Sequence, residues 1–98
     1  MTTLTIEQQC TIQEVCFLEN SISVLLDDGR TITVPLAWYP RLYHATQAER
    51  NHYELIGDGE GIHWPDLDED ISSEGIIAGR RSKESQNSLK KWLKKRQP

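Results

Sequence analysis

Cysteine is scarce in this 98-residue chain, which contains only Cys10 and Cys16. On the single strand that we predict around them, these two residues would lie about 20 Å apart, which is too far for a disulfide. There is no second cysteine pair and no cysteine-histidine spacing typical of zinc ligands. The sequence therefore predicts two reduced thiols and no structural metal.

Long apolar runs are also missing. No segment approaches the roughly 20 apolar residues that a membrane-spanning helix needs. The first ten residues, MTTLTIEQQC, lack the charged and apolar regions of a signal peptide. We therefore predict a cytoplasmic protein without membrane contact, and the length predicts a single folded domain.

The short motifs of common enzyme classes are absent as well. The chain has no G-x-S-x-G nucleophile elbow, no Walker lysine motif and no H-E-x-x-H zinc motif. The run GDGEG resembles a phosphate-binding loop only superficially, because the acids around it would repel phosphate. The sequence therefore favours a protein with no catalytic residues and no cofactor.

Positive charge is scarce until residue 80 and abundant after it. Residues 1–79 carry three arginines and fourteen acids, a net charge of -11. Residues 80–98 carry eight basic residues and one acid, a net charge of +7. This asymmetry predicts an α+β domain over residues 1–79, followed over residues 80–98 by a polar linker and a basic amphipathic tail.

Strand-like alternation dominates residues 10–34. In SISVLL, Ile22, Val24 and Leu26 alternate with serines and a leucine, and RTITV repeats the pattern after the turn residues DDG. These segments predict an antiparallel three-stranded meander with one apolar face that other elements must cover. A short second hairpin is expected around the glycine-rich turn at 57–61. We expect one core that includes Val24, Ile32, Trp38, Leu55 and Trp64.

Helix signals follow the meander. Pro40 can begin a short helix, and Thr46 and Glu49 have the spacing of a capping box. Ser72 is a suitable N-cap for a further helix, which Gly79 would end. The predicted fold class is α+β: a three-stranded meander plus a short second hairpin, covered by two or three short helices, with a basic C-terminal helix.

The stretch GIHWPDLDED, residues 61–70, most resembles a functional site. Its alternating aspartates imitate an EF-hand calcium loop, but isoleucines stand where that loop needs a glycine and a glutamate. We favour a structural interpretation, in which Asp68 and Asp70 cap the helix that begins near Ser72. A looser metal site, an acid–base pair with His63, and an acidic rim for a partner are the alternatives.

Two groups of residues are candidates for binding a partner. The first group is Trp38, Tyr39, Arg41, His63, Trp64, Asp66, Asp68 and Asp70. The second group, in the tail, is Arg80, Arg81, Lys90, Lys91, Trp92, Lys94 and Lys95. The tail could fray in solvent, dock on the acidic body of its own or a neighbouring chain, as in a homodimer, or contact nucleic acid. Its linker, RRSKESQNS, is expected to be a hinge without core anchors.

The segments PLAWYPRL, ERNHYELIGDGEGIHWPDLDEDIS and GIIAG occur in this order after the meander. Over roughly residues 10–79, the chain thereby resembles the bacterial domain of unknown function 2442 family. The resemblance implies a small α+β domain, joined in some members to a helix-turn-helix domain, for which residues 80–98 are too few. It also implies a gene context like that of toxin–antitoxin pairs, and it implies no catalytic residues.

Three functions remain open. The favoured one is a non-enzymatic protein-interaction or regulatory module, the antitoxin-like half of a two-gene pair, whose partner is a small protein encoded by the adjacent gene. The second is a DNA-associated transcriptional regulator that acts through the basic tail. The third is a small metal-dependent hydrolase centred on His63.

Overall fold

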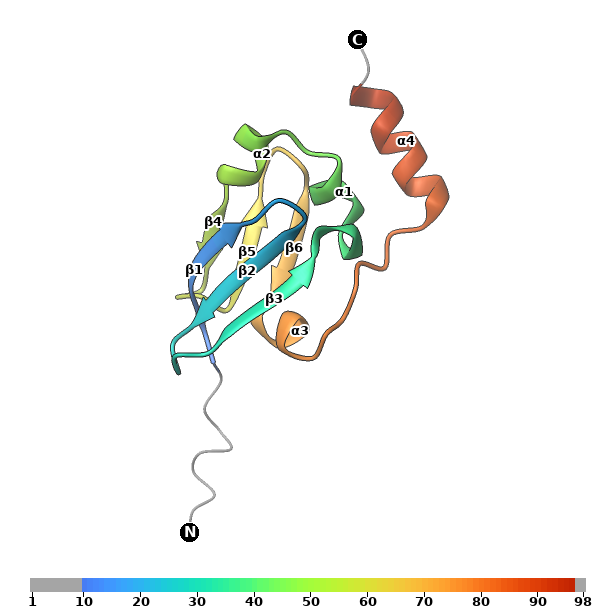
Figure 1. Ribbon diagram of the computed structural model, residues 1–98. Helices are drawn as coiled ribbons and strands as arrows, with labels where there is room; N and C mark the ends of the chain where they lie inside the picture. Colours follow the sequence, from blue (N-terminus) through green and yellow to red (C-terminus); the bar gives the residue numbers. More distant parts are fainter. Residues whose placement is uncertain (1–9, 97–98) are drawn as a thin grey trace.

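The first sheet contains three consecutive antiparallel strands. The computed structural model describes residues 10–96, and Figure 1 shows their arrangement. The strands are β1 (Ile12–Phe17), β2 (Ser21–Leu26) and β3 (Thr31–Pro35), in the order β1-β2-β3. A β-bulge between Ile12 and Glu14 shifts the register of β1. The even-numbered Ile12 therefore faces the core, whereas after the bulge the odd-numbered Val15 and Phe17 do so. The predicted meander is confirmed.

The second sheet contains β4 (Glu54–Ile56), β5 (Gly61–Trp64) and β6 (Glu69–Ser72), in the order β4-β5-β6. It holds one strand more than the hairpin expected from the sequence, because residues 69–72 continue the ladder instead of leading directly into a helix. The α+β class is confirmed.

The two sheets touch closely at one point. The N–H of Ile12 donates to the carbonyl of Gly59 over 2.7 Å. A Cβ atom on Gly59 would lie 2.4 Å from the carbonyl oxygen of Ile12, and Gly59 has a φ of +97°. Only glycine therefore fits this contact between the start of β1 and the β4–β5 turn.

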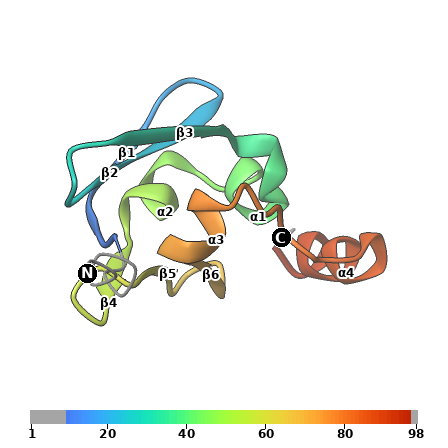
Figure 2. The same cartoon turned by 90° about the horizontal axis from the view of Figure 1, so that it is seen from below.

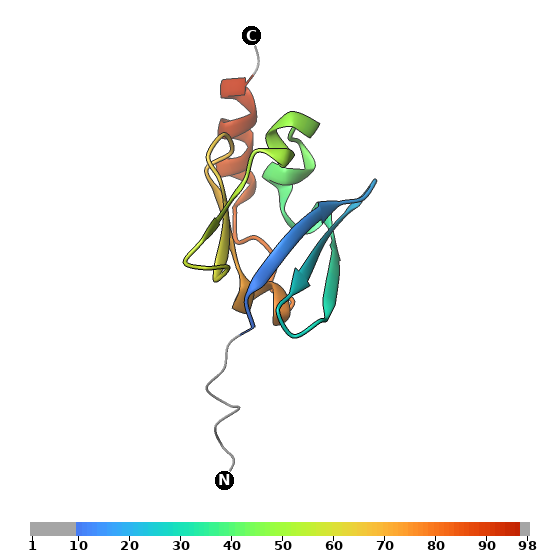
Figure 3. The same ribbon diagram turned by 90° about the vertical axis from the view of Figure 1, so that its left-hand side faces the viewer.

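Short helices lie at the ends of the space between the sheets. Figure 2 shows α1, α2 and α3 between the two layers, and Figure 3 shows the sheets diverging toward α1 and α2. The helical elements are η2 (Leu36–Trp38, a 3-10 helix), α1 (Pro40–Tyr43), α2 (Gln47–Asn51), α3 (Ser73–Ile77) and α4 (Gln86–Arg96). No helix within residues 10–96 has the length and hydrophobicity to cross a bilayer.

Local sequence signals set the bounds of α2 and α3. Thr46 and Glu49 form the expected capping box at the start of α2. Ser72 caps α3, and Gly79, with a φ of +75°, ends it. The N–H groups of Gly79 and Arg80 donate to the carbonyls of Ile76 and Gly75, which is the hydrogen-bond pattern of a Schellman motif.

The core lies between the two sheets. Its buried side chains are Ile12, Ile22, Val24, Leu26, Val34, Leu36, Tyr39, Leu42, Ile62, Trp64, Leu67, Ile71 and Ile76. Of the predicted core residues, Val24 and Trp64 are fully buried, and Ile32 and Trp38 pack against the core while half-buried. Leu55 was expected in the core but is 39% exposed, because the three-residue strand β4 lies at the edge of its sheet.

Candidate functional site

The acidic stretch forms the β5–β6 hairpin, and its tip is a tight turn. The N–H of Leu67 donates to the carbonyl of Trp64, and Asp68 has a φ of +53°. Leu67, between two aspartates, is fully buried and anchors the turn in the core. The predicted capping of α3 by Asp68 and Asp70 is wrong. The Oγ of Ser72 accepts the N–H of Gly75 instead, because Asp68 precedes β6 and Asp70 lies within it, opposite His63 of β5.

Two of the acids pair with histidines from other segments. Oδ2 of Asp66 lies 2.7 Å from Nδ1 of His52, which ties the hairpin tip to the end of α2. Oδ1 of Asp70 lies 2.5 Å from Nδ1 of His63, its cross-strand neighbour. The hydrogen bond to Asp70 raises the pKa of His63. Glu54 stands opposite His63 on the other side, so β4, β5 and β6 form a row of Glu, His and Asp.

Glu69 differs from the other acids because it is half-buried, opposite the fully buried Trp64 in the β5–β6 register. Burial, followed by the nearby negative charge of Glu84, raises the pKa of Glu69 to about 7, while Arg41 acts in the opposite direction. Glu69 also lines a hollow of about 250 Å³ that Tyr39, Arg80 and other residues at the start of the tail complete. The carboxyl group is therefore neutral in a substantial part of the molecules near neutral pH.

Arg41 joins the hairpin tip to the tail. Its Nη1 donates to the carbonyl of Leu67 over 2.8 Å, and its Nε and Nη2 donate to the carboxylate of Glu84 over 3.0 and 2.7 Å. The side chains of this ion pair are only 16% and 9% exposed. The planar guanidinium binds the carboxylate through two nitrogens and the carbonyl through the third. It therefore fixes the orientation of Glu84 as well as its distance from the hairpin tip.

The tail docks on the body of its own chain. Arg96 of α4 donates to both carboxylate oxygens of Glu49 in α2 over 2.7 and 2.9 Å. The indole of Trp92 lies near two guanidinium groups, 5.2 Å from that of Arg41 and 4.5 Å from that of Arg96. Figure 1 shows α4 beside α1 and outside the two-sheet body. Charge pairs and cation–π contacts therefore attach α4, together with the packing of the half-buried Trp92 against the core.

The segment before α4 is also tied to the body. The hydroxyl of Tyr39 donates to the carbonyl of Arg80, and the N–H of Ser82 donates to the carbonyl of Trp38. The guanidinium of Arg81 lies 4.7 Å from the centre of the Trp38 ring. The expected hinge without anchors is thus wrong, because backbone and aromatic groups of η2 and α1 hold this segment. The division at residue 79 also predicts that residues 1–79 fold without the tail, and this stays a prediction.

The outer face of α4 carries four exposed lysines, Lys90, Lys91, Lys94 and Lys95. Their spacing of i, i+1, i+4 and i+5 places them on one side of the helix, opposite the half-buried Leu89, Trp92 and Leu93. None of them forms an ion pair with a carboxylate among residues 10–96. The basic charge of the tail is therefore divided between arginines that face the body or its rim and lysines that face solvent.

The predicted partner-binding residues do not form one surface. Trp64 is fully buried, and its Nε1 donates to the carbonyl of Arg50. Tyr39 is buried and Trp38 and Arg41 are half-buried beneath the tail. Asp66, Asp68 and Asp70 are exposed on the hairpin. The role of these residues in binding a partner stays a prediction.

Several residues that assemble this region were missed by the sequence interpretation. They are Glu49, His52, Glu69, Glu84 and Arg96. Glu49 had a local signal as a capping-box residue, but nothing in the sequence indicated that Arg96 would bind the same carboxylate. Among residues 10–96 no group of three or more His, Cys, Asp or Glu side chains could hold a metal ion. Cys10 and Cys16 are free thiols, as predicted.

Comparison with known proteins gives a family and a fold. The family model described as "Protein of unknown function (DUF2442)" matches residues 12–82. A crystal structure of a protein of unknown function from Rhodospirillum rubrum is 24% identical, with a TM-score of 0.67, over 84% of this chain and 99% of that one. A solution NMR structure of an uncharacterised protein from Chromobacterium violaceum is 24% identical, with a TM-score of 0.65, over 90% of this chain and 80% of that one. No curated protein matches the chain.

Proposed function

The chain belongs to the DUF2442 family, and we propose that it is a non-enzymatic protein-interaction module, the antitoxin-like half of a two-gene pair. The observation that carries this proposal is the attachment of α4. Its only aromatic residue, Trp92, lies near two guanidinium groups and packs against the core while only half-buried. A helix held in this way can exchange its contacts with the body for contacts with another protein.

The charges around α4 support such an exchange. Two ion pairs beside α4 join the body to the tail, Arg41 to Glu84 and Glu49 to Arg96. A partner that offers a carboxylate to Arg41 or a basic group to Glu49 competes directly with the tail. The displaced helix would then present Leu89, Trp92 and Leu93 as one apolar face, which fits a hydrophobic groove of a small protein.

The partner is the small protein encoded by the adjacent gene, and its chemistry follows from the body. Because residues 1–79 carry a net charge of -11, a basic partner surface is favoured there. Two contact regions, the acidic body and the apolar face of α4, would hold the partner from two sides. Binding in this manner would regulate the partner by covering it, without a chemical step.

Co-purification with the product of the adjacent gene tests the proposal. The full chain should retain the partner, and Trp92→Ala should weaken the affinity at least about tenfold, as expected for a central aromatic contact. Lys94→Ala on the outer face of α4 is the matched control and should change the affinity less than about threefold. If the full chain retains no partner, or if Trp92→Ala binds as tightly as the unchanged chain, the proposal is wrong.

A second function, DNA association through the tail, is favoured by one observation, the four solvent-facing lysines of α4. Four phosphate contacts would give a slope of about -3.6 in a plot of log affinity against log salt. Replacing Lys90, Lys91, Lys94 and Lys95 with glutamine should then abolish binding to duplex DNA. The acidic body opposes the approach of DNA, so we rank this function below protein binding. Electrophoretic mobility measurements at several salt concentrations distinguish the two.

A further inference from the structure

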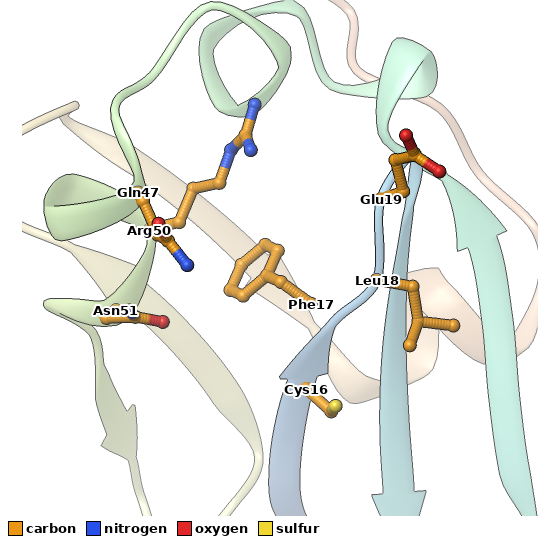
Figure 4. A pocket seen from close by; sticks show the side chains of 7 residues that line it. All are labelled: Cys16, Phe17, Leu18, Glu19, Gln47, Arg50 and Asn51. Atoms are coloured by element: carbon orange, nitrogen blue, oxygen red, sulfur yellow. The ribbon is translucent and has the colours of Figure 1, made fainter.

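A hollow of about 480 Å³ lies between the end of β1 and α2 (Figure 4). Cys16, Phe17, Leu18 and Glu19 line it from the β1 side, and Gln47, Arg50 and Asn51 line it from α2. In Figure 4, Phe17 points from β1 toward the α2 side. Ligand-binding hollows in proteins have volumes of about 300–1,000 Å³, so this one has room for a segment of a few residues.

The backbone on the β1 side of the hollow is an open strand edge. β1 is the outer strand of its sheet. Residues in an antiparallel ladder direct their N–H and C=O groups alternately toward the neighbouring strand and away from it. The N–H of Leu18 donates to Ser21, and Cys16 stands opposite Ser23, so the groups of Phe17 point away from β2. Phe17 has no backbone hydrogen-bond partner beyond that edge within residues 10–96.

Val15 shows that this edge accepts hydrogen bonds. It has the same parity as Phe17, and its carbonyl lies 3.5 Å from the hydroxyl of Tyr53, which approaches from beyond the edge. Two residues further along, at Phe17, the hollow takes the place of such a group. The next strand of a sheet would lie about 4.8 Å beyond β1, and that position falls on the side where the hollow opens.

The opposite wall offers side-chain amides rather than a second strand edge. Gln47 and Asn51 belong to α2 and are exposed. Their amides can bond to the outer edge of a segment that lies along β1. The guanidinium of Arg50 is already committed, because its Nε and Nη2 donate to the carbonyls of Leu42 and Tyr43, each over 2.9 Å. The wall thus carries one positive group, Arg50, whose donors are occupied by carbonyls, and one negative group, Glu19.

We propose that this hollow binds a short extended segment of a partner protein, which adds to β1 as a fourth strand. The segment has three or four residues in the hollow and an apolar side chain directed at Phe17. Basic residues stand at its flanks, because residues 1–79 around the hollow carry a net charge of -11. The helix α2 stands across the hollow from β1, so the added strand lies between β1 and α2. Strand addition of this kind gains affinity from main-chain hydrogen bonds.

This inference rests on the proposed function only in that both require a protein partner, and it concerns a different surface. Residues of α4 do not line the hollow. The helix α2 borders both surfaces, because its Glu49 binds Arg96 of α4, so the variants below are chosen at residues that make no contact with the other surface.

Hydrogen exchange of the full chain, followed by NMR, tests whether the edge is open. The amide of Phe17 should exchange at least about tenfold faster than that of Cys16, which faces Ser23. If the two amides are equally protected in dilute protein, the edge is closed and the proposal is wrong. If protection of Phe17 appears only as the protein concentration rises, a second copy occupies the edge, and the proposal is also overturned.

A defined peptide tests the occupant. The probe is an acetylated and amidated pentapeptide of lysine, threonine, valine, threonine and lysine, and its control has the same sequence with N-methylated main-chain amides. We expect the probe to protect Phe17 and to shift the side-chain amide signals of Gln47 and Asn51. The control should bind at least about tenfold more weakly, because it cannot donate main-chain hydrogen bonds. Equal binding of both peptides, absence of binding, or shifts confined to α4 would overturn the proposal.

Two variants link the peptide to the hollow. Gln47→Trp fills the space beside β1 and should abolish peptide binding. Gln86→Trp places the same side chain on an exposed position of α4 and should bind the peptide normally. If Gln47→Trp binds the probe as well as the unchanged chain does, the hollow is not the site. If Gln47→Trp retains the partner while Trp92→Ala loses it, this inference fails and the proposed function stands.

Discussion

Trp64 and Trp92 show how differently the body and the tail of this molecule are held. The ring of Trp64 is completely buried, and the ring centres of Phe17 and Tyr53 each lie 6.3 Å from it. Trp92 lies on a helix without a buried residue and contacts two guanidinium groups. Dispersion and hydrophobic burial stabilise the first environment, whereas the second combines partial burial against the core with cation–π contacts.

This difference predicts different responses to the solvent. Hydrophobic burial depends little on moderate salt, whereas contacts between partly exposed charges weaken as salt screens them. The body should therefore stay folded under conditions in which α4 separates from it. The predictions below test this separation, from the largest expected effect to the smallest.

Trp64→Ala should lower the free energy of unfolding by about 3–5 kcal/mol, because it leaves a large cavity between the sheets. Trp64→Phe keeps most of the ring volume but loses the hydrogen bond to the carbonyl of Arg50, and it should cost less. Trp92→Ala is the comparison in the tail and should cost about 1 kcal/mol or less. Urea denaturation measures all three. Equal losses for the two alanine variants would show that α4 is part of the same core.

Arg41→Ala should cost roughly 1.5–3 kcal/mol, because hydrogen bonds to a charged group are lost and Glu84 keeps a little-exposed carboxylate without its partner. Arg41→Lys retains the charge but not the planar fork, so an intermediate loss is expected. Thermal melting gives the stability, and hydrogen exchange in α4 reports whether the helix has separated. If α4 stays as protected in Arg41→Ala as in the unchanged chain, this arginine does not hold the tail.

Glu69 should make stability depend on pH between about 4.5 and 7. Its folded pKa of about 7 lies above the usual value of 4.5. The folded state therefore holds the proton more tightly than the unfolded state, and this contribution is lost as pH rises through that window. Glu69→Gln should remove this loss of stability at high pH and raise the free energy of unfolding at pH 8 by roughly 1–2 kcal/mol. Glu14→Gln, at an exposed position of β1, is the control. An unchanged pH profile in Glu69→Gln would contradict the assigned pKa.

Arg96→Ala should have the smallest effect, about 1 kcal/mol or less, and the effect should shrink further at 0.5 M salt, an ionic strength of about three times the physiological value. Arg96 is the main cause of the low pKa of Glu49, about 2. The stabilisation by this pair is present above pH 4.5 and is lost as pH falls toward 2. Melting curves of Arg96→Ala and the control Lys95→Ala, recorded across this acid range, should therefore converge at its lower end.

Local patterns in the sequence predicted the elements that local contacts build. The alternation of Ile22, Val24 and Leu26 predicted β2, because strand residues on one face share one environment. The capping box of α2 and the helix end at Gly79 were also predicted, since both depend on residues within one turn. These features fix the order of elements and most of the buried face of the first sheet.

Contacts between segments distant in the sequence explain the predictions that were wrong and the site residues that were missed. Asp68 and Asp70 precede a correct N-cap, so their sequence is typical of the start of a helix. His63, seven residues before Asp70, draws that carboxylate into a strand pair instead. The partners Arg41 and Glu84 are 43 residues apart. No periodicity connects such positions, and the candidate site around the tail therefore became visible only in three dimensions.

The sheets themselves have a consequence for how the chain assembles. Each sheet pairs only strands that follow one another in sequence. The two meanders can therefore form independently, each by closing short turns, before the chain closes the longer loop that brings Gly59 to Ile12. Pairing between consecutive strands shortens the loops that must close first, and the docking of one finished sheet on the other is expected to be the slower step.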